Sequence, residues 1–279
     1  MSRDDLPIIT KSRIVRDLRS LGLDAGQVVM LHGSVKAIGW VVGGPDVVLD
    51  ALLEVLTPTG TLMMYIAWED GTYEMRGWPE EKRQAYLDEC PGFDPATSRA
   101  YRKWGILTEY LRTRPGARRS GNPEWSMAAV GAKADWLTKE HQINHGAGPG
   151  SPMARLVEAG GKVLLLGAPL STVSLLHYAE YVARVPDKRS VRYSEPLMRQ
   201  GRREWIEIEE LDSEDGIADW AGPAGDYFTA IMQEFVSSGR GRQGLVGAAQ
   251  SYLFDAAELV DFAARWMERE FGGGQREAL

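Results

Sequence analysis

Apolar and polar residues follow one another along the first part of the chain in blocks that predict helices and strands in turn. Residues 10–22 carry apolar side chains at helical spacing and end in Gly22, a common stop signal. The apolar runs 27–31 and 61–66 predict strands, and between them Pro45 suits the first turn of a helix. This order predicts an α/β fold with a mostly parallel central sheet flanked by helices.

The rest of the chain extends this pattern. Ser151 is a suitable N-cap for one further helix, and Asp255 for the last one. No linker divides the chain, so residues 1–279 are predicted to form a single domain, in which the region at about 189–219 shapes a substrate cleft. The further predicted elements are strands at 125–130 and 162–166, helices at 105–114, 132–139, 151–158, 173–184, 226–236 and 255–270, and an antiparallel hairpin of 189–198 with 202–208.

One long segment, at about 67–101, interrupts the alternation of helices and strands. It is rich in both aromatic and acidic side chains. Long connections of this composition often act as lids or binding loops, and aromatic faces with carboxylates suit a polycationic ligand. A helical insertion with a small core of its own explains the same composition, so both interpretations stay open.

Composition excludes several classes of protein. The net charge of −7 argues against a general nucleic-acid binder, which usually carries a basic surface. No apolar stretch is long enough to span a membrane, and the acidic start of the chain is not a secretory signal. The single cysteine, Cys90, suits a reducing compartment, so a cytoplasmic location is expected.

The charges are strongly segregated along the chain. Residues 99–119 hold seven basic residues and one acid, whereas residues 204–219 hold eight acids and no base. Each block could be an ordinary solvated face. Two opposite blocks in one domain also fit a protein that binds one anionic and one cationic ligand.

The stretch 162–180 carries the best candidate for catalysis. A predicted buried strand ends in a turn of small residues, and the next helix carries His177 with Glu180 one turn further on. Ligand sites of α/β proteins lie beyond the carboxyl ends of strands, and a carboxylate beside an imidazole fixes its tautomer. A helix histidine that bonds only to solvent or backbone is the alternative.

Other catalytic signatures are weak or missing. There is no G-x-S-x-G elbow for a nucleophilic serine and no P-loop. His141 and His145 are four residues apart, but Gln142 stands where a zinc protease has its glutamate, so no metal is expected. The turn from His32 to Lys36 and the pair Arg118–Arg119 suit anionic groups, although an ordinary strand-to-helix turn is the commoner explanation of such a turn as the first.

Several motifs together carry a resemblance that covers about residues 10–271. The runs LHGSVKAIGWVVGGPDVVLDALLEVLTPTGTLMMY, FDPATS, PGARRSGNP and GGKVLLLGAPLSTVSLLHYAE, followed by PDKR, closely resemble the aminoglycoside 3-N-acetyltransferases. The resemblance implies transfer of an acetyl group from acetyl-coenzyme A to the 3-amino group of the 2-deoxystreptamine ring, and hence antibiotic resistance. It also implies a fold other than that of the common acetyltransferases with the R/Q-x-x-G-x-G/A signature.

The resemblance also implies roles for individual residues. His177 matches the catalytic histidine and Glu180 its neighbouring carboxylate. One departure from the family is Asn122, where many members have a histidine. We interpret this difference as evidence that the side chain at this position has a positioning role. The expected coenzyme A contacts are His32, Gly33, Ser34, Val35, Lys36, Arg118, Arg119 and Ser120, and the expected drug contacts are Tyr65, Trp68, Asp94, Glu209, Glu210 and Asp212.

The expected reaction is direct transfer in a ternary complex with His177 as the general base, because no activated serine or cysteine is apparent. The expected partners are acetyl-coenzyme A and an aminoglycoside, without nucleic acid, membrane or metal, in a monomer or homodimer. Two alternatives stay open: an acyl-coenzyme A-dependent N-acetyltransferase for another amine-bearing natural product, and a non-enzymatic binder of polyamines or amino sugars.

Overall fold

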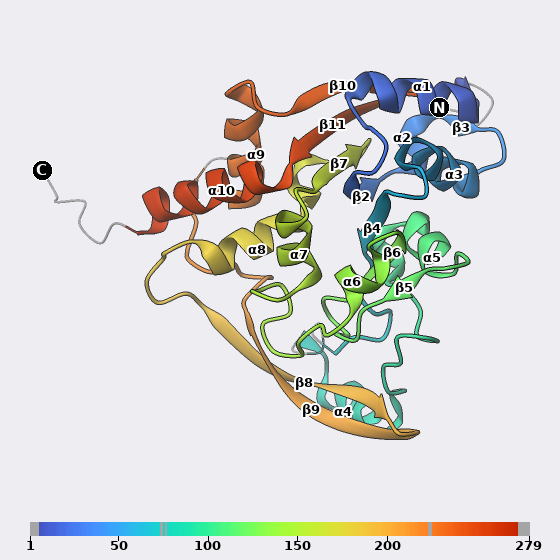
Figure 1. Cartoon of the computed structure of the whole chain (residues 1–279). Helices are drawn as coiled ribbons and strands as arrows, with labels where there is room; N and C mark the ends of the chain where they lie inside the picture. The colour runs from blue at the N-terminus through green and yellow to red at the C-terminus, as the bar shows by residue number, and fades with distance from the viewer. Residues whose placement is uncertain (1–5, 73–74, 76, 223–224, 273–279) are drawn as a thin grey trace, which may run out of the picture.

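Successive residues of the central strands point to opposite faces of one sheet, and helices cover both faces (Figure 1). In the second strand Val28 and Met30 join one apolar cluster, whereas Val29 and Leu31 join the other. The computed structural model describes residues 6–72, 75, 77–222 and 225–272. The predicted α/β architecture is confirmed.

The bounds of the elements agree closely with the periodicity of the sequence. The strands are β1 (Ile8–Ile9), β2 (Val28–Gly33), β3 (Trp40–Val41), β4 (Thr61–Tyr65), β5 (Arg118–Arg119), β6 (Met127–Gly131), β7 (Lys162–Leu166), β8 (Ser190–Arg199), β9 (Arg202–Leu211), β10 (Arg242–Val246) and β11 (Ala249–Asp255). The α-helices are α1 (Lys11–Leu21), α2 (Val35–Ile38), α3 (Pro45–Leu56), α4 (Glu80–Glu89), α5 (Ile106–Arg112), α6 (Ala134–Thr138), α7 (Pro152–Glu158), α8 (Leu175–Val182), α9 (Tyr227–Ser237) and α10 (Ala256–Phe271). Short 3-10 helices lie at Arg102–Trp104 and Leu170–Thr172.

The central sheet has the strand order β10-β11-β7-β2-β4-β6-β5. Only β7, β2 and β4 pair in parallel, and the strands on either side of these three are antiparallel. The expectation of a mostly parallel sheet is therefore corrected. A tight hairpin joins β10 to β11, and β6 returns beside β4, in the opposite direction, after a connection that contains α4, α5 and β5.

Helices α1, α3 and α5 pack on one face of the sheet, and α6 to α10 pack on the other. Capping residues fix several of their ends. Thr10 and Asp255 accept hydrogen bonds from the first turns of α1 and α10, and Gly22 ends α1 with a φ of 103°. Within the described residues no helix is both long and apolar enough to cross a bilayer.

The insertion and the hairpin β8–β9 lie together beyond the sheet, with α4 beside the hairpin (Figure 1). Phe93 bonds through its backbone to Pro196 and Met198 of β8, and the Arg203 guanidinium of β9 donates to the carbonyls at the end of α4. Trp68, Cys90 and Phe93 form a small apolar cluster beneath them. The insertion thus has a core of its own, as one of the two interpretations expects.

Candidate active site

A cleft of about 1140 Å³ opens at the carboxyl ends of the three parallel strands. Residues 33–36 after β2, 67–71 after β4 and 171–174 after β7 all contribute to its walls. This is the edge at which α/β proteins place their ligands, because loops from neighbouring strands converge there.

The turn after β7 delivers helix α8 to the cleft. Gly167 has a φ of 66°, and a β-carbon on it would lie 2.6 Å from that of Ala37 and 2.9 Å from that of Ala249. Only glycine tolerates both the left-handed backbone and the close approach. The turn then runs along the cleft wall and places His177 in the first part of α8.

His177 is held by a buried carboxylate. Its Nδ1 lies 2.8 Å from Oε2 of Glu180, which is 1% exposed. The Tyr227 hydroxyl donates to the other oxygen, Oε1, and itself accepts the Ile217 N–H at 3.2 Å. In the tautomer in which Glu180 accepts the Nδ1 proton, the lone pair of the imidazole is on Nε2, the nitrogen left to meet a ligand.

Two aromatic rings fix the plane of that imidazole. The ring centroids of Trp125 and Phe228 lie 4.8 Å and 4.7 Å from that of His177, both at steep angles. Asn122 positions Trp125 in turn: its side-chain oxygen accepts the Trp125 N–H at 2.8 Å, and its amide nitrogen donates to the carbonyls of Gln142 and Ile143. The geometry thus gives Asn122 a supporting contact.

A second hollow, of about 670 Å³, meets the cleft at His177. Ser171, Ser213, Glu214 and Phe228 also line both spaces. The walls of the second hollow are acidic, with Glu214, Asp215, Asp219 and Asp226. The imidazole therefore stands at a junction that two different molecules can reach from different sides.

The five expected coenzyme A residues from His32 to Lys36 all line the cleft. The Ser34 N–H bonds to the Leu166 carbonyl at 2.9 Å, so this N–H is not available to a ligand. Burial lowers the pKa of His32 to about 4, which keeps its imidazole neutral at pH 7. Lys36 is exposed and brings positive charge to this end of the cleft.

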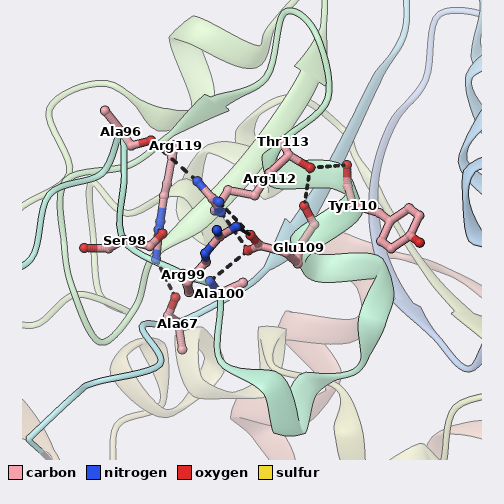
Figure 2. A network of polar contacts seen from close by, with 10 residues as sticks. All are labelled: Ala67, Ala96, Ser98, Arg99, Ala100, Glu109, Tyr110, Arg112, Thr113 and Arg119. Carbon is pink, nitrogen blue, oxygen red and sulfur yellow. Dashed lines mark hydrogen bonds and ion pairs between the residues drawn. The ribbon is translucent and has the colours of Figure 1, made fainter.

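The other three expected coenzyme A residues lie elsewhere. The Arg119 guanidinium donates to the carbonyls of Ala67 and Ser98 (Figure 2). It also donates to the Ser126 hydroxyl. Burial lowers the pKa of Arg119 to about 9, with neighbouring Arg112 acting in the same direction. Ser120 is fully buried against His141, and Arg118 is an exposed edge-strand residue near Asp135. These contacts make Arg119 and Ser120 structural.

Most of the basic block 99–119 is likewise used within the protein. Figure 2 shows Arg99 and Arg112 directed at the Glu109 carboxylate, with ion-pair distances of 2.6 Å each. Burial alone would raise the pKa of Glu109, but the hydrogen bonds from Arg112 and Arg99 outweigh it and lower the value to about 2. Arg114 pairs with Asp50, and Arg102 pairs with Glu69.

Of the expected drug contacts, Tyr65 and Trp68 line the cleft. Tyr65 stacks on Trp125 with a centroid distance of 5.4 Å, which extends the aromatic wall away from His177. Asp94 instead closes its own turn, where its carboxylate accepts the Ala96 N–H and the Thr97 hydroxyl.

The three acids expected from the acidic block are engaged within the protein. Glu209 pairs with Arg192 on the hairpin at 2.7 Å. Glu210 is 2% exposed and accepts from the Gly146 N–H and the Tyr181 hydroxyl, and burial raises its pKa to about 8. Asp212 accepts the N–H groups of Glu214 and Asp215, so it shapes the loop whose Glu214 reaches the cleft.

The cleft is lined by four carboxylates that were not among the expected drug contacts: Glu69, Asp70, Glu124 and Glu214. Glu69 and Asp70 directly follow Trp68 in the insertion, so the aromatic and acidic composition of that segment was a usable signal. Glu124 had no such signal, since it precedes β6 and reaches the cleft only through the tertiary fold.

The two histidines at 141 and 145 lie in a loop. Both ring nitrogens of His141 have partners, the Ser120 hydroxyl and the Gly146 carbonyl, and burial lowers its pKa to about 4. Among the described residues, no three or more His, Cys, Asp or Glu side chains gather as a metal site would require.

Known proteins resemble this chain over nearly its whole length. A family model described as aminoglycoside 3-N-acetyltransferase matches residues 30–268. Aminoglycoside N(3)-acetyltransferase III of Pseudomonas aeruginosa is 47% identical over 264 residues, which cover 94% of this chain and 95% of the relative. Aminoglycoside N(3)-acetyltransferase VII of Streptomyces paromomycinus is 45% identical over 276 residues, with 98% and 96% covered.

Solved structures agree. The crystal structure of aminoglycoside acetyltransferase AAC(3)-Xa superposes with a TM-score of 0.91 at 47% identity, over 96% of this chain and 95% of that one. AAC-IIIb, solved as a binary complex with CoASH, gives a TM-score of 0.87 at 45% identity, over 96% and 100%. AAC-VIa bound to sisomicin gives 0.89 at 40% identity, also over 96% and 100%.

The fold and the cleft define an acetyltransferase with a histidine–carboxylate pair on helix α8, beyond the carboxyl ends of the parallel strands. Within that class, the chain belongs to the aminoglycoside 3-N-acetyltransferase family.

Proposed function

We propose that this enzyme transfers the acetyl group of acetyl-coenzyme A to the 3-amino group of the 2-deoxystreptamine ring of an aminoglycoside, and so confers resistance to it. The observation that carries the proposal is the position of His177, at the junction of the cleft with the acidic hollow. Family relatives bound to CoASH and to sisomicin support the same pair of substrates.

In this proposal the two ends of the site receive ligands of opposite charge. Residues 33–36 and Lys103 form the end that suits the phosphates of acetyl-coenzyme A, with two lysines and the polar turn after β2. Asp70, Glu124 and Glu214 suit the ammonium groups of the drug, while Trp104 and Tyr65 offer flat apolar faces to its rings.

His177 serves as the general base. Its Nε2 takes a proton from the 3-amino group as the nitrogen attacks the thioester carbonyl, and a carbon–nitrogen bond forms. Collapse of the tetrahedral intermediate breaks the carbon–sulfur bond, and the leaving thiolate takes up a proton, giving the amide and free coenzyme A. Glu180 holds Nδ1 throughout and stabilises the protonated imidazole.

Replacing His177 by Gln tests this role. The variant keeps a polar side chain but no base, so acetyl transfer should fall by about two orders of magnitude or more while coenzyme A binding persists. The matched control is His145→Gln, since His145 lies outside the cleft walls and its loss should leave turnover close to that of the wild type. Near-normal turnover in His177→Gln would contradict the assignment.

A thiol-release assay with acetyl-coenzyme A and a panel of amines tests the substrate class. Release with aminoglycosides, and none with simple polyamines, is the expected result. Release only with amines that lack the deoxystreptamine ring would favour an N-acetyltransferase for another natural product. No release with any amine would overturn the proposed activity.

A further inference from the structure

Phe228 lies between the two spaces that meet at His177. Five of the described residues line both the cleft and the acidic hollow, and Phe228 is the apolar one among them. The others are Ser171, His177, Ser213 and Glu214. The Phe228 ring centroid is 4.7 Å from that of the imidazole, at an interplanar angle of 60°. A side chain that lines two adjoining spaces lies at their boundary, so this ring forms part of the partition between them.

The start of helix α9 holds the Phe228 ring in place. Asp226 caps the helix, and its carboxylate accepts the Thr229 N–H and the Thr229 hydroxyl, each at 2.8 Å. The adjacent Tyr227 packs against Phe228 with ring centroids 5.1 Å apart, and it donates to Glu180 behind the imidazole. One turn of helix therefore fixes both the support of the imidazole and the ring beside it.

The two sides of this partition differ in polarity. Glu214, Asp215 and Asp219 line the hollow and are exposed, and ionised carboxylates are strongly hydrated. On the cleft side the imidazole packs against the Trp125 ring, with centroids 4.8 Å apart. The Phe228 ring thus separates a space that solvent enters freely from an apolar stretch of the cleft.

A base that activates an amine can also activate water. When water replaces the amine, Nε2 of His177 takes a proton from it as the water oxygen attacks the thioester carbonyl. A carbon–oxygen bond forms and the carbon–sulfur bond breaks. The proton on Nε2 passes to the leaving thiolate, and the products are acetic acid and free coenzyme A. This side reaction consumes the acetyl donor without modifying a drug, and active sites suppress such reactions by excluding water.

Building on the proposed function, we propose that Phe228 suppresses this hydrolysis by keeping the water of the hollow away from the acetyl-coenzyme A thioester. With the ring in place, the nucleophile beside Nε2 is the amine of a bound drug. Without the ring, the hollow and the cleft join beside His177, and the enzyme hydrolyses acetyl-coenzyme A when no drug is bound. Phe228 thereby determines which nucleophile the site uses, and it does so by filling space.

Acetyl-coenzyme A with no amine present tests the barrier directly. Phe228→Ala should release thiol at least about tenfold faster than the wild type, because solvent gains a path to the thioester. Phe228→Leu keeps most of the side-chain volume without an aromatic ring, so its release should stay close to that of the wild type. Phe228→Val should lie between the two. Each folded member of the series is informative, since release should rise as the side chain becomes smaller.

A second measurement compares the two products during turnover with an aminoglycoside. The wild type should form coenzyme A and acetylated drug in equal amounts, whereas Phe228→Ala should form more coenzyme A than acetylated drug. A merely structural defect would slow both products together and keep them equal. The control is Phe271→Ala: Phe271 packs on Tyr227 at a centroid distance of 5.4 Å but lines neither space, so its products should stay equal.

The double variant Phe228→Ala with His177→Gln identifies the base. Its thiol release without an amine should fall to the wild-type level or below, because the water has no base to take its proton. Release that does not rise from Phe228→Leu to Phe228→Ala, or that persists in the double variant, would overturn the proposal. These assays need no drug. Wild-type enzyme that acetylates no aminoglycoside would instead refute the proposed function.

Discussion

At the scale of single residues, a chain of hydrogen bonds lies behind the imidazole that we propose as the general base. Tyr227 donates to Glu180, which in turn accepts from His177. Burial, and then the charge of Glu180, raises the pKa of Tyr227, so it remains a donor at neutral pH. Without this donor the negative charge of Glu180 would be less dispersed and would attract the imidazole proton more strongly.

The variant Tyr227→Phe should therefore lower kcat by about tenfold and move the acidic limb of the kcat/KM profile to higher pH. The control is Tyr181→Phe, which removes a buried hydroxyl that bonds to Glu210 on the same side of the molecule. It should lower stability without moving the profile. Parallel profiles for both variants and the wild type would argue against a tuning role for Tyr227.

The contact between His177 and Glu180 could be predicted from the sequence because one strand, one turn and one helix place the pair. His177 and Glu180 are three residues apart in a single helix, so their contact is local. The acids that line the cleft could not be predicted in this way. Strand β9 continues past Ile208, and successive side chains of a strand point to opposite faces. Glu210 is therefore buried, and Glu209 faces Arg192 on the other side. Glu124 reaches the cleft only through tertiary packing.

At the scale of elements, Glu109 ties α5 to the end of the insertion. Its carboxylate accepts hydrogen bonds from the Arg112 side chain within α5. It also accepts them from the Arg99 side chain and the Ala100 N–H, at the end of the insertion (Figure 2). Its pKa of about 2 lies below the ordinary 4.5, so its contribution to stability is complete above pH 4.5 and is lost as the pH falls toward 2.

Glu109→Gln should therefore reduce the free energy of unfolding by about 1–2 kcal/mol at pH 7. The difference from wild type should stay constant down to pH 5 and shrink below pH 4.5, as measured by urea unfolding. Glu54→Gln is the control, because its pair with Lys11 is half exposed and should contribute under ~1 kcal/mol. A Glu109 effect that persists unchanged at pH 3 would contradict the ion-pair explanation.

The order of helices and strands was predictable because apolar periodicity is a local property. The direction of each strand was harder to predict. Strands β2, β4 and β7 are parallel, as the alternation of helices and strands implies, but β6 returns beside β4 in the opposite direction after the insertion. Nothing in the apolar run of β6 encodes that direction, because pairing depends on where the insertion leaves the chain.

At the scale of the whole molecule, four buried groups set how stability depends on pH. Glu195 and Glu210 have pKa values raised to about 8, so the folded state keeps protons that the unfolded state loses above pH 4.5. His32 and His141 have values lowered to about 4, so the unfolded state binds protons first below pH 6.5. Between pH 4.5 and 6.5 the glutamates and the histidines change the stability in opposite directions as the pH rises. Above pH 6.5 only the glutamates change it.

The melting temperature should accordingly fall between pH 6.5 and 8. Glu210→Gln removes one of the two groups responsible and should make this fall shallower. Its neighbour Glu209 is on the opposite face of β9 and bonds to Arg192, so Glu209→Gln should leave the slope unchanged. A wild-type melting temperature that is flat or rising over this range would contradict the assignment.

The insertion at 67–101 leaves the sheet after β4, and its two ends meet, because the Tyr101 N–H donates to the Ile66 carbonyl at 2.9 Å. The chain between them begins and ends at almost the same place, so closing it costs little more whether it is long or short. Its length and sequence can change without shifting a strand of the sheet or moving His177. The part of the cleft wall that residues 67–101 supply can therefore vary on its own, and we expect that grafting these residues from one relative to another would change drug preference while leaving His177 and Trp125 in place.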